Sequence, residues 1–234
     1  MGEKNIILGD FELDSYSRDQ SPFPDTKPEI AIRPRTTKEV SEIVSFCAQD
    51  KIPILPFGSG YSFSGLSNRA RSRTLVMDLK RMTRILEVNR KDLYVRSECG
   101  IIVGKLADKI LSSGLYLSTV SVPYYKDKLG GVISGVIGGG IPQFSSSMGF
   151  NNRHTILGLK VVLPDGIVVE TSGKGANVHG FDAHMRETNA PDITGLFVSD
   201  GGSFGVKTEA TLAIQPLPPE WDYSSWVFDG FDNA

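Results

Sequence analysis

Residues 56 to 65 carry the clearest chemical signal in the sequence, Pro-Phe-Gly-Ser-Gly-Tyr-Ser-Phe-Ser-Gly. Three glycines and three serines in ten residues leave little side-chain bulk along this backbone. Such a loop can curl until several N–H groups converge on one anion, and this arrangement holds phosphate without a lysine. The loop follows an apolar stretch, Ile52 to Leu55, that is typical of a buried strand. It therefore indicates a nucleotide or dinucleotide ligand, although a plain connecting loop can have the same composition.

The glycine loop does not match the common phosphate-binding motifs. It lacks the Gly-Lys-Ser/Thr ending of the nucleoside triphosphate loop, and no similar ending occurs elsewhere in the chain. Gly58, Gly60 and Gly65 have the wrong last spacing for the G-x-G-x-x-G dinucleotide fingerprint. A nucleotide held here must be held by another architecture.

No other residue pattern predicts protein-borne chemistry. The sequence shows no Ser/His/Asp nucleophile signature and no paired carboxylates placed for acid–base work. Its 3 histidines and 2 cysteines have no zinc-ligand spacing, and Cys47 and Cys99 lie too far apart in sequence to suggest a disulfide framework. We therefore expect no metal site, assign no catalytic residue, and expect any chemistry to belong to a cofactor.

Charge and hydropathy exclude several classes of partner. The 25 basic and 27 acidic residues nearly balance, and the arginine-rich stretch 69–73 fits a solvated loop better than a nucleic-acid patch. No apolar run is long enough to span a bilayer, and the N-terminus lacks a signal-peptide pattern. We expect a cytoplasmic protein that binds no nucleic acid, peripheral to a membrane only through a partner.

Hydrophobic periodicity and turn signals divide the chain into two regions. The N-terminal residues are predicted to be an extended arm, followed by an α/β unit: an edge strand at 29–33, a helix from a capping box at Thr36 and Glu39 through 49, and strands at 52–55 and 75–79. The later region is predicted to hold mainly hairpins, at 85–98 and 156–171, with helices at 103–112 and 192–197, a helix opening at 130–131, and a closing strand at 205–214.

Seven segments, in the same order and spacing, resemble the FAD-binding domain of the vanillyl-alcohol oxidase / p-cresol methylhydroxylase superfamily. They are residues 16–19, 32–40, 54–65, 129–131, 157–166, 194–197 and 204–212. The branch that the chain resembles most is that of the D-lactate, glycolate and 2-hydroxyglutarate dehydrogenases, which are FAD-linked oxidases. The resemblance covers about residues 14–218.

The resemblance implies an α+β fold, the PCMH-type FAD-binding fold of two lobes with FAD between them. The predicted division is an arm at 1–23, an FAD-binding domain at 24–218, and a tail at 219–234 leading to a cap domain that this chain does not include. Within the domain, a small α/β lobe is expected at about 24–80, and a larger lobe with a mostly antiparallel sheet flanked by helices at about 81–218.

The resemblance also assigns cofactor-binding residues. The first loop would wrap the FAD diphosphate with Pro56, Phe57, Gly58, Ser59, Gly60, Tyr61, Ser62 and Gly65. A second strip would bring Pro123, Leu129, Gly130, Gly131, Ser134, Gly135 and Gly138 against the cofactor, and Val206 would meet its adenine end. Tyr61 stands where some members carry a histidine bonded covalently to FAD, so FAD is expected to be bound non-covalently. Ser199-Asp200-Gly201-Gly202 replaces the usual Gly-Ser-Glu-Gly.

The activity implied is oxidation of a small-molecule 2-hydroxy acid, of the D-lactate or glycolate type, by hydride transfer to flavin N5. The residues that bind the substrate would come from a cap domain or a cap-bearing partner subunit, and an electron-accepting partner is also expected. A second interpretation stays open: a non-catalytic module, or a truncated fragment, that binds FAD and docks to a partner subunit. An oxidase that passes electrons to oxygen is a third, weaker one.

Overall fold

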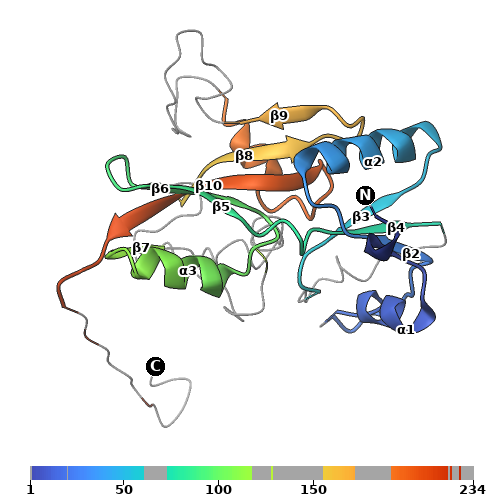
Figure 1. Cartoon of the computed structure of the whole chain (residues 1–234), viewed down its shortest axis with the longest axis horizontal. Coiled ribbons are helices and arrows are strands. Elements are labelled where there is room, and N and C mark those ends of the chain that lie inside the picture. The colour runs from blue at the N-terminus through green and yellow to red at the C-terminus, as the bar shows by residue number, and fades with distance from the viewer. Residues whose placement is uncertain are drawn as a thin grey trace.

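The computed structural model describes residues 2–19, 21–60, 73–117, 128, 155–171, 191–220, 222 and 227. These residues form two sheets, one of four strands and one of six (Figure 1). The predicted helix opening at 130–131 lies outside the described residues.

The four-stranded sheet has the order β1-β2-β4-β3. Its strands are β1 (Ile6–Ile7), β2 (Ile30–Ile32), β4 (Leu75–Asp78) and β3 (Ile54–Phe57). β4 runs parallel to both β2 and β3, and β1 pairs antiparallel with β2. The carboxyl ends of the three parallel strands therefore lie along one edge, where α/β sheets characteristically bind ligands.

Opposite faces of this sheet are covered by different parts of the chain. Leu75 and Met77 belong to the main hydrophobic core, together with Val40 and Val44 of α2 (Thr37–Gln49). On the other face, Val76 packs in a smaller cluster with residues of the N-terminal segment, chiefly Ile7, Leu13 and Tyr16. Because successive side chains of a strand alternate between faces, Asp78 lies on the same face as Val76, toward the N-terminal segment.

Helix α2 begins where its capping box predicts. The backbone N–H of Glu39 donates to Thr36 Oγ1 at 3.1 Å, which satisfies one of the free N–H groups of the first turn. In a capping box this glutamate usually accepts from the N–H of the N-cap residue, here Thr36. The Glu39 carboxylate instead accepts from the N–H of the preceding residue, Arg35, at 2.7 Å.

The six-stranded sheet is antiparallel throughout. Its main path is β5 (Ile85–Asn89), β6 (Tyr94–Glu98), β10 (Val206–Pro216), β8 (Ile156–Val162) and β9 (Val168–Glu170), and β7 (Leu115–Leu117) pairs with the end of β10. Helix α3 (Val103–Leu111) buries Leu106 and Ile110 completely in the main core. The sheet and helix together make the larger lobe that the sequence predicted.

The two lobes meet where α2 lies against the turn between β8 and β9 (Figure 1). Ser41 Oγ donates to the Gly166 carbonyl at 2.6 Å, and Ser45 Oγ to the Asp165 carbonyl at 3.2 Å. Gly166 has φ +88°, and a Cβ there would lie 1.9 Å from Ser45 Oγ. The turn requires glycine because both its backbone conformation and this close approach exclude a side chain.

Three expectations about local structure were wrong. The N-terminal residues are not extended throughout, since they form η1 (Glu3–Asn5), β1, α1 (Asp10–Leu13) and η2 (Asp14–Tyr16). β2 is not an edge strand, because β1 covers its outer side. The helix expected at 192–197 is a short 3₁₀ turn, η3 (Thr194–Phe197).

Candidate cofactor site

The first candidate loop begins at the carboxyl end of β3. Pro56 and Phe57 close the strand, and Gly58, Ser59 and Gly60 turn away from it. The Phe57 side chain is buried and meets the Tyr16 ring edge-on, with 4.9 Å between centroids. The start of the loop is thus anchored in the smaller core cluster.

Gly60 gives the loop its shape. Its φ of +74° lies in the left-handed region, and a Cβ there would sit 2.9 Å from Phe57 Cζ. Both features favour glycine, and a left-handed residue within a turn helps neighbouring N–H groups to point the same way. The local geometry of this loop fits an anion held by backbone donors.

A second glycine turn lies against the first loop. Ser199, Gly201 and Gly202 all have positive φ, and a Cβ on Gly202 would lie 3.6 Å from Pro56 Cγ. Val206 follows as the buried first residue of β10, paired with Val162 of β8. The fold therefore brings Gly202 of the second turn beside Pro56 at the start of the first loop, although the two are far apart in sequence.

The Asp200 side chain stabilises this second turn through hydrogen bonds with its backbone. Its carboxylate accepts from the Gly202 N–H at 2.9 Å and the Phe204 N–H at 3.2 Å, and it forms a close ion pair with Lys207. Both side chains are almost fully buried, and burial lowers the pKa of Lys207 despite the nearby carboxylate. The aspartate that stands in the variant Ser-Asp-Gly-Gly sequence thus has a structural role in shaping the turn.

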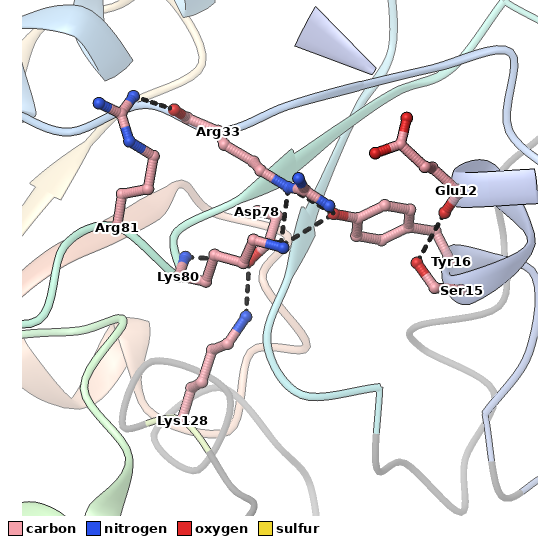
Figure 2. Close-up of polar contacts among 8 residues, drawn as sticks. All are labelled: Glu12, Ser15, Tyr16, Arg33, Asp78, Lys80, Arg81 and Lys128. Carbon is pink, nitrogen blue, oxygen red and sulfur yellow. Dashed lines mark hydrogen bonds and ion pairs between the residues drawn. The ribbon is translucent and has the colours of Figure 1, made fainter. Parts of the chain in front are cut away.

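A buried polar cluster lies beside the first loop, at the end of β4. Asp78 is the register partner of Phe57 and is only 2% exposed. Its carboxylate accepts from Tyr16 Oη at 3.0 Å, from the Lys80 backbone N–H at 2.9 Å and from Lys128 Nζ at 2.6 Å (Figure 2). Every partner is a donor, so the charge of the buried carboxylate is fully compensated.

Arginine and lysine outnumber the carboxylate in this cluster. Arg33 donates through Nε and Nη2 to Tyr16 Oη at 3.0 and 2.8 Å, and its Nε lies 3.8 Å from Asp78. Lys80 Nζ is 3.9 Å from Asp78, and Glu12 of α1 faces it at longer range (Figure 2). Burial, and then the negative charge of Asp78, raise the pKa of Tyr16 to about 12. Burial lowers the pKa of Lys80, and the positive charges of Arg33 and Lys128 add to this effect.

The structure describes six of the predicted site residues: five are consecutive at the carboxyl end of β3 and after it, and the sixth is the first residue of β10. These are Pro56, Phe57, Gly58, Ser59, Gly60 and Val206. The others lie outside the described residues: Tyr61, Ser62, Gly65, Pro123, Leu129, Gly130, Gly131, Ser134, Gly135 and Gly138.

Sequence reasoning missed two polar groups at this edge. It assigned neither Asp78 nor Lys207 to the site. Asp78 ends an otherwise apolar strand, a signal that could have marked it, because an unpaired charge is rarely buried. Lys207 gave no such signal, because β10 also carries Thr208 and Glu209. The partners of Asp78 could not be read from its signal.

The residues present fit an FAD diphosphate. Two glycine turns expose backbone without side chains, at the carboxyl edge of parallel strands, next to a cluster in which three cations surround one buried carboxylate. A linker with two negative charges suits both the backbone donors and this local surplus of positive charge.

Comparison with known proteins agrees with the geometry. A family model described as "FAD binding domain" matches residues 28–172. The chain belongs to this FAD-binding domain family. Its cofactor is FAD, as the sequence predicted.

Curated relatives of this FAD-binding domain include an oxidase subunit and a dehydrogenase by name. The chain is 33% identical over 223 residues to "Glycolate oxidase subunit GlcD" of Bacillus subtilis. This match covers 94% of this chain and 44% of that protein. It is 28% identical over 218 residues to "Probable D-lactate dehydrogenase, mitochondrial" of Danio rerio, covering 93% of this chain and 41% of that protein. The chain thus spans less than half the length of these two relatives.

Solved structures confirm the PCMH-type fold. A p-cresol methylhydroxylase with bound substrate superposes with a TM-score of 0.75 at 22% identity, covering 94% of this chain and 42% of that one. An alkyldihydroxyacetonephosphate synthase gives a TM-score of 0.77 at 17% identity, covering 93% of this chain and 42% of that one.

Among the described residues of the FAD-binding domain, no helix is long and apolar enough to cross a membrane.

Proposed function

We propose that this chain is the FAD-binding part of a flavin-dependent dehydrogenase that oxidises a 2-hydroxy acid of the D-lactate or glycolate type. The observation that carries the proposal is the meeting of two glycine turns, 56–60 and 199–206, at the carboxyl edge of the parallel strands. The names of the relatives support the choice of substrate class.

Residues of the two turns would hold the cofactor. Backbone N–H groups of Gly58, Ser59 and Gly60 would face the diphosphate, with Tyr61, Ser62 and Gly65 continuing the loop, and Val206 would lie at the adenine end. The strip formed by Leu129, Gly130, Gly131, Ser134, Gly135 and Gly138, with Pro123, would approach from the other lobe. Bound FAD supplies the hydride acceptor, flavin N5. Because Tyr61 takes the place of a covalently linked histidine, the cofactor would be held non-covalently.

Groups outside this chain would complete the reaction. A 2-hydroxy acid needs a cation to bind its carboxylate and a base to take its hydroxyl proton, and we assign neither to a residue of this chain. We propose that a cap domain or partner subunit provides them, and that a partner accepts the electrons. The domain division at 23, 80 and 218 and the cytoplasmic location stay predictions.

The test begins with binding. Purified protein mixed with FAD and freed of excess cofactor should keep the visible absorption bands of flavin, and denaturation should release all of the flavin into solution. A colourless protein that FAD does not affect would overturn the proposal. Flavin that stays attached to the denatured chain would overturn its non-covalent part.

Anaerobic reduction then tests the substrate. D-lactate or glycolate, added together with the cap-bearing or electron-accepting partner, should bleach the flavin bands, whereas L-lactate serves as the stereochemical control. We expect little bleaching without the partner, and rapid bleaching of the isolated chain would contradict our assignment of the substrate-binding groups. Flavin that no 2-hydroxy acid reduces, even with the partner present, would favour the alternative of a non-catalytic docking module.

A further inference from the structure

Lys128 reaches from the larger lobe to the edge of the smaller one. Its backbone forms an isolated antiparallel bridge with Ile102, the residue that precedes α3. Its ammonium group lies 2.6 Å from Asp78 Oδ1, at the end of β4 in the four-stranded sheet. The side chains are 15% and 3% exposed, so this ion pair joins the two lobes in a largely water-excluded setting.

The position of Asp78 places this ion pair beside the first glycine loop. Asp78 and Phe57 are directly paired residues on adjacent parallel strands, and Gly58 follows Phe57. Strands in a sheet lie about 4.8 Å apart, so the carboxylate is one strand away from the point where the loop begins. In sequence, Lys128 directly precedes Leu129-Gly130-Gly131, the second strip to which the family resemblance assigns cofactor contacts.

The remaining contacts of Asp78 hold it in one orientation. Tyr16 Oη and the Lys80 N–H each occupy a carboxylate oxygen, and Arg33 fixes Tyr16 through two hydrogen bonds (Figure 2). Tyr16 is in turn packed against Phe57. The Asp78 carboxylate is therefore held in a fixed orientation in which it accepts from Lys128 of the other lobe. Both of its oxygens accept hydrogen bonds from groups of the protein.

We infer that Asp78 is a positioning residue for the cofactor site: it fixes Lys128, and with it the larger lobe, against the edge that carries the first glycine loop. This inference rests on the proposed function, because it concerns how the FAD site is assembled. Asp78 also holds the Lys128 ammonium group at the end of β4, next to the strand from which the first loop leaves, and the three cations around Asp78 leave a positive surplus that favours the diphosphate.

Substitution of Asp78 distinguishes a positioning role from a purely electrostatic effect on FAD affinity. Asp78→Asn removes one negative charge near the proposed diphosphate, so a purely electrostatic effect would tighten FAD binding. Loss of positioning predicts the opposite, a Kd for FAD raised tenfold or more. Lys128→Met should raise the Kd similarly, and Lys128→Arg, which keeps the ion pair, should restore most of the affinity.

The double variant tests whether the two residues act as one unit. If Asp78 acts through Lys128, the Kd of Asp78→Asn/Lys128→Met should be no more than about threefold above that of Lys128→Met, because coupled residues are not additive. Glu170→Gln is the matched control, since it removes another ion pair, 2.9 Å long, with Lys160 on the six-stranded sheet. This control should bind FAD as the wild type does.

Measurements on the full chain should combine FAD titration with visible circular dichroism of the bound flavin, at a temperature where each variant is folded. A changed flavin dichroism in Asp78→Asn, absent in Glu170→Gln, marks a displaced cofactor rather than general destabilisation. Wild-type or tighter FAD binding in Asp78→Asn would overturn the inference. If Asp78→Asn does not fold, the FAD affinity of Lys128→Met tests the inference instead. An FAD affinity unchanged from the wild type in Lys128→Met would overturn the inference equally. Failure of the wild type to bind FAD would instead refute the proposed function.

Discussion

Replacing Gly60 by alanine should weaken FAD binding through the backbone alone. Gly60 has φ +74°, where an L-residue costs about 1–2 kcal/mol, and the new Cβ would lie 2.9 Å from Phe57 Cζ. The expected fold-change takes as its premise that the substituted loop relaxes out of this conformation in the free protein. Binding that needs the original conformation must restore the strain, and at 1.4 kcal/mol per tenfold the Kd should rise about 5- to 30-fold.

Gly114 offers a matched control for this substitution. Its φ is +70°, almost the same as that of Gly60, but no atom lies within 4 Å of the Cβ that alanine would add. It lies in the turn between α3 and β7, two elements that lie away from β3 (Figure 1). Gly114→Ala should therefore lower the free energy of unfolding by about 1–2 kcal/mol while leaving FAD affinity unchanged.

The assay is fluorescence titration of FAD into each apoprotein, with thermal unfolding measured in parallel. The decisive quantity is the difference between the two variants in FAD affinity, because both carry a similar backbone strain. An unchanged FAD affinity in Gly60→Ala, or an equal loss in Gly114→Ala, would show that the first loop does not hold the diphosphate.

Three further predictions concern stability. Asp200→Asn leaves Lys207 buried without its counter-charge and should lower the free energy of unfolding by about 3–5 kcal/mol in denaturant titration. The double variant Asp200→Asn/Lys207→Met should lose less stability than Asp200→Asn alone. An equal or larger loss in the double variant would contradict a stabilising ion pair. Gly166→Ala brings a Cβ to 1.9 Å from Ser45 Oγ at φ +88° and should cost about 2 kcal/mol or more, so an unchanged melting temperature would show that the lobe contact is not tight. The pKa of Tyr16 is raised from 10.0 to about 12, so the folded state keeps a proton that the unfolded state loses. Stability should therefore fall between pH 10 and about 12, by up to about 1.4 kcal/mol per pH unit, more steeply than in Tyr16→Phe, and parallel pH profiles would contradict this assignment.

Local signals in the sequence were enough to predict the elements that frame the site. The capping box at Thr36 placed the start of α2, and the Pro164-Asp165-Gly166 turn placed the hairpin of β8 and β9. These features depend on neighbours within a few residues, so the chain encodes them locally. The first glycine loop was predicted for the same reason.

Long-range packing explains what the sequence did not show. The N-terminal segment lacks a strong period of its own, and it folds because Leu13 and Tyr16 cover a face of the four-stranded sheet. Tyr16 and Lys128 reach Asp78 from 62 and 50 positions away, a pairing that no local pattern can encode. The resemblance to a known family supplied the cofactor, whereas the polar groups that assemble its site required the structure.

Whether backbone near Gly60 holds the diphosphate of FAD can be seen in a crystal structure of the full chain grown with FAD. We expect diphosphate oxygens within hydrogen-bond distance of the N–H groups of Gly58, Ser59 and Gly60, beside the turn at 199–206, with Lys128 still paired to Asp78. A diphosphate bound elsewhere, with these N–H groups facing only solvent, would contradict it.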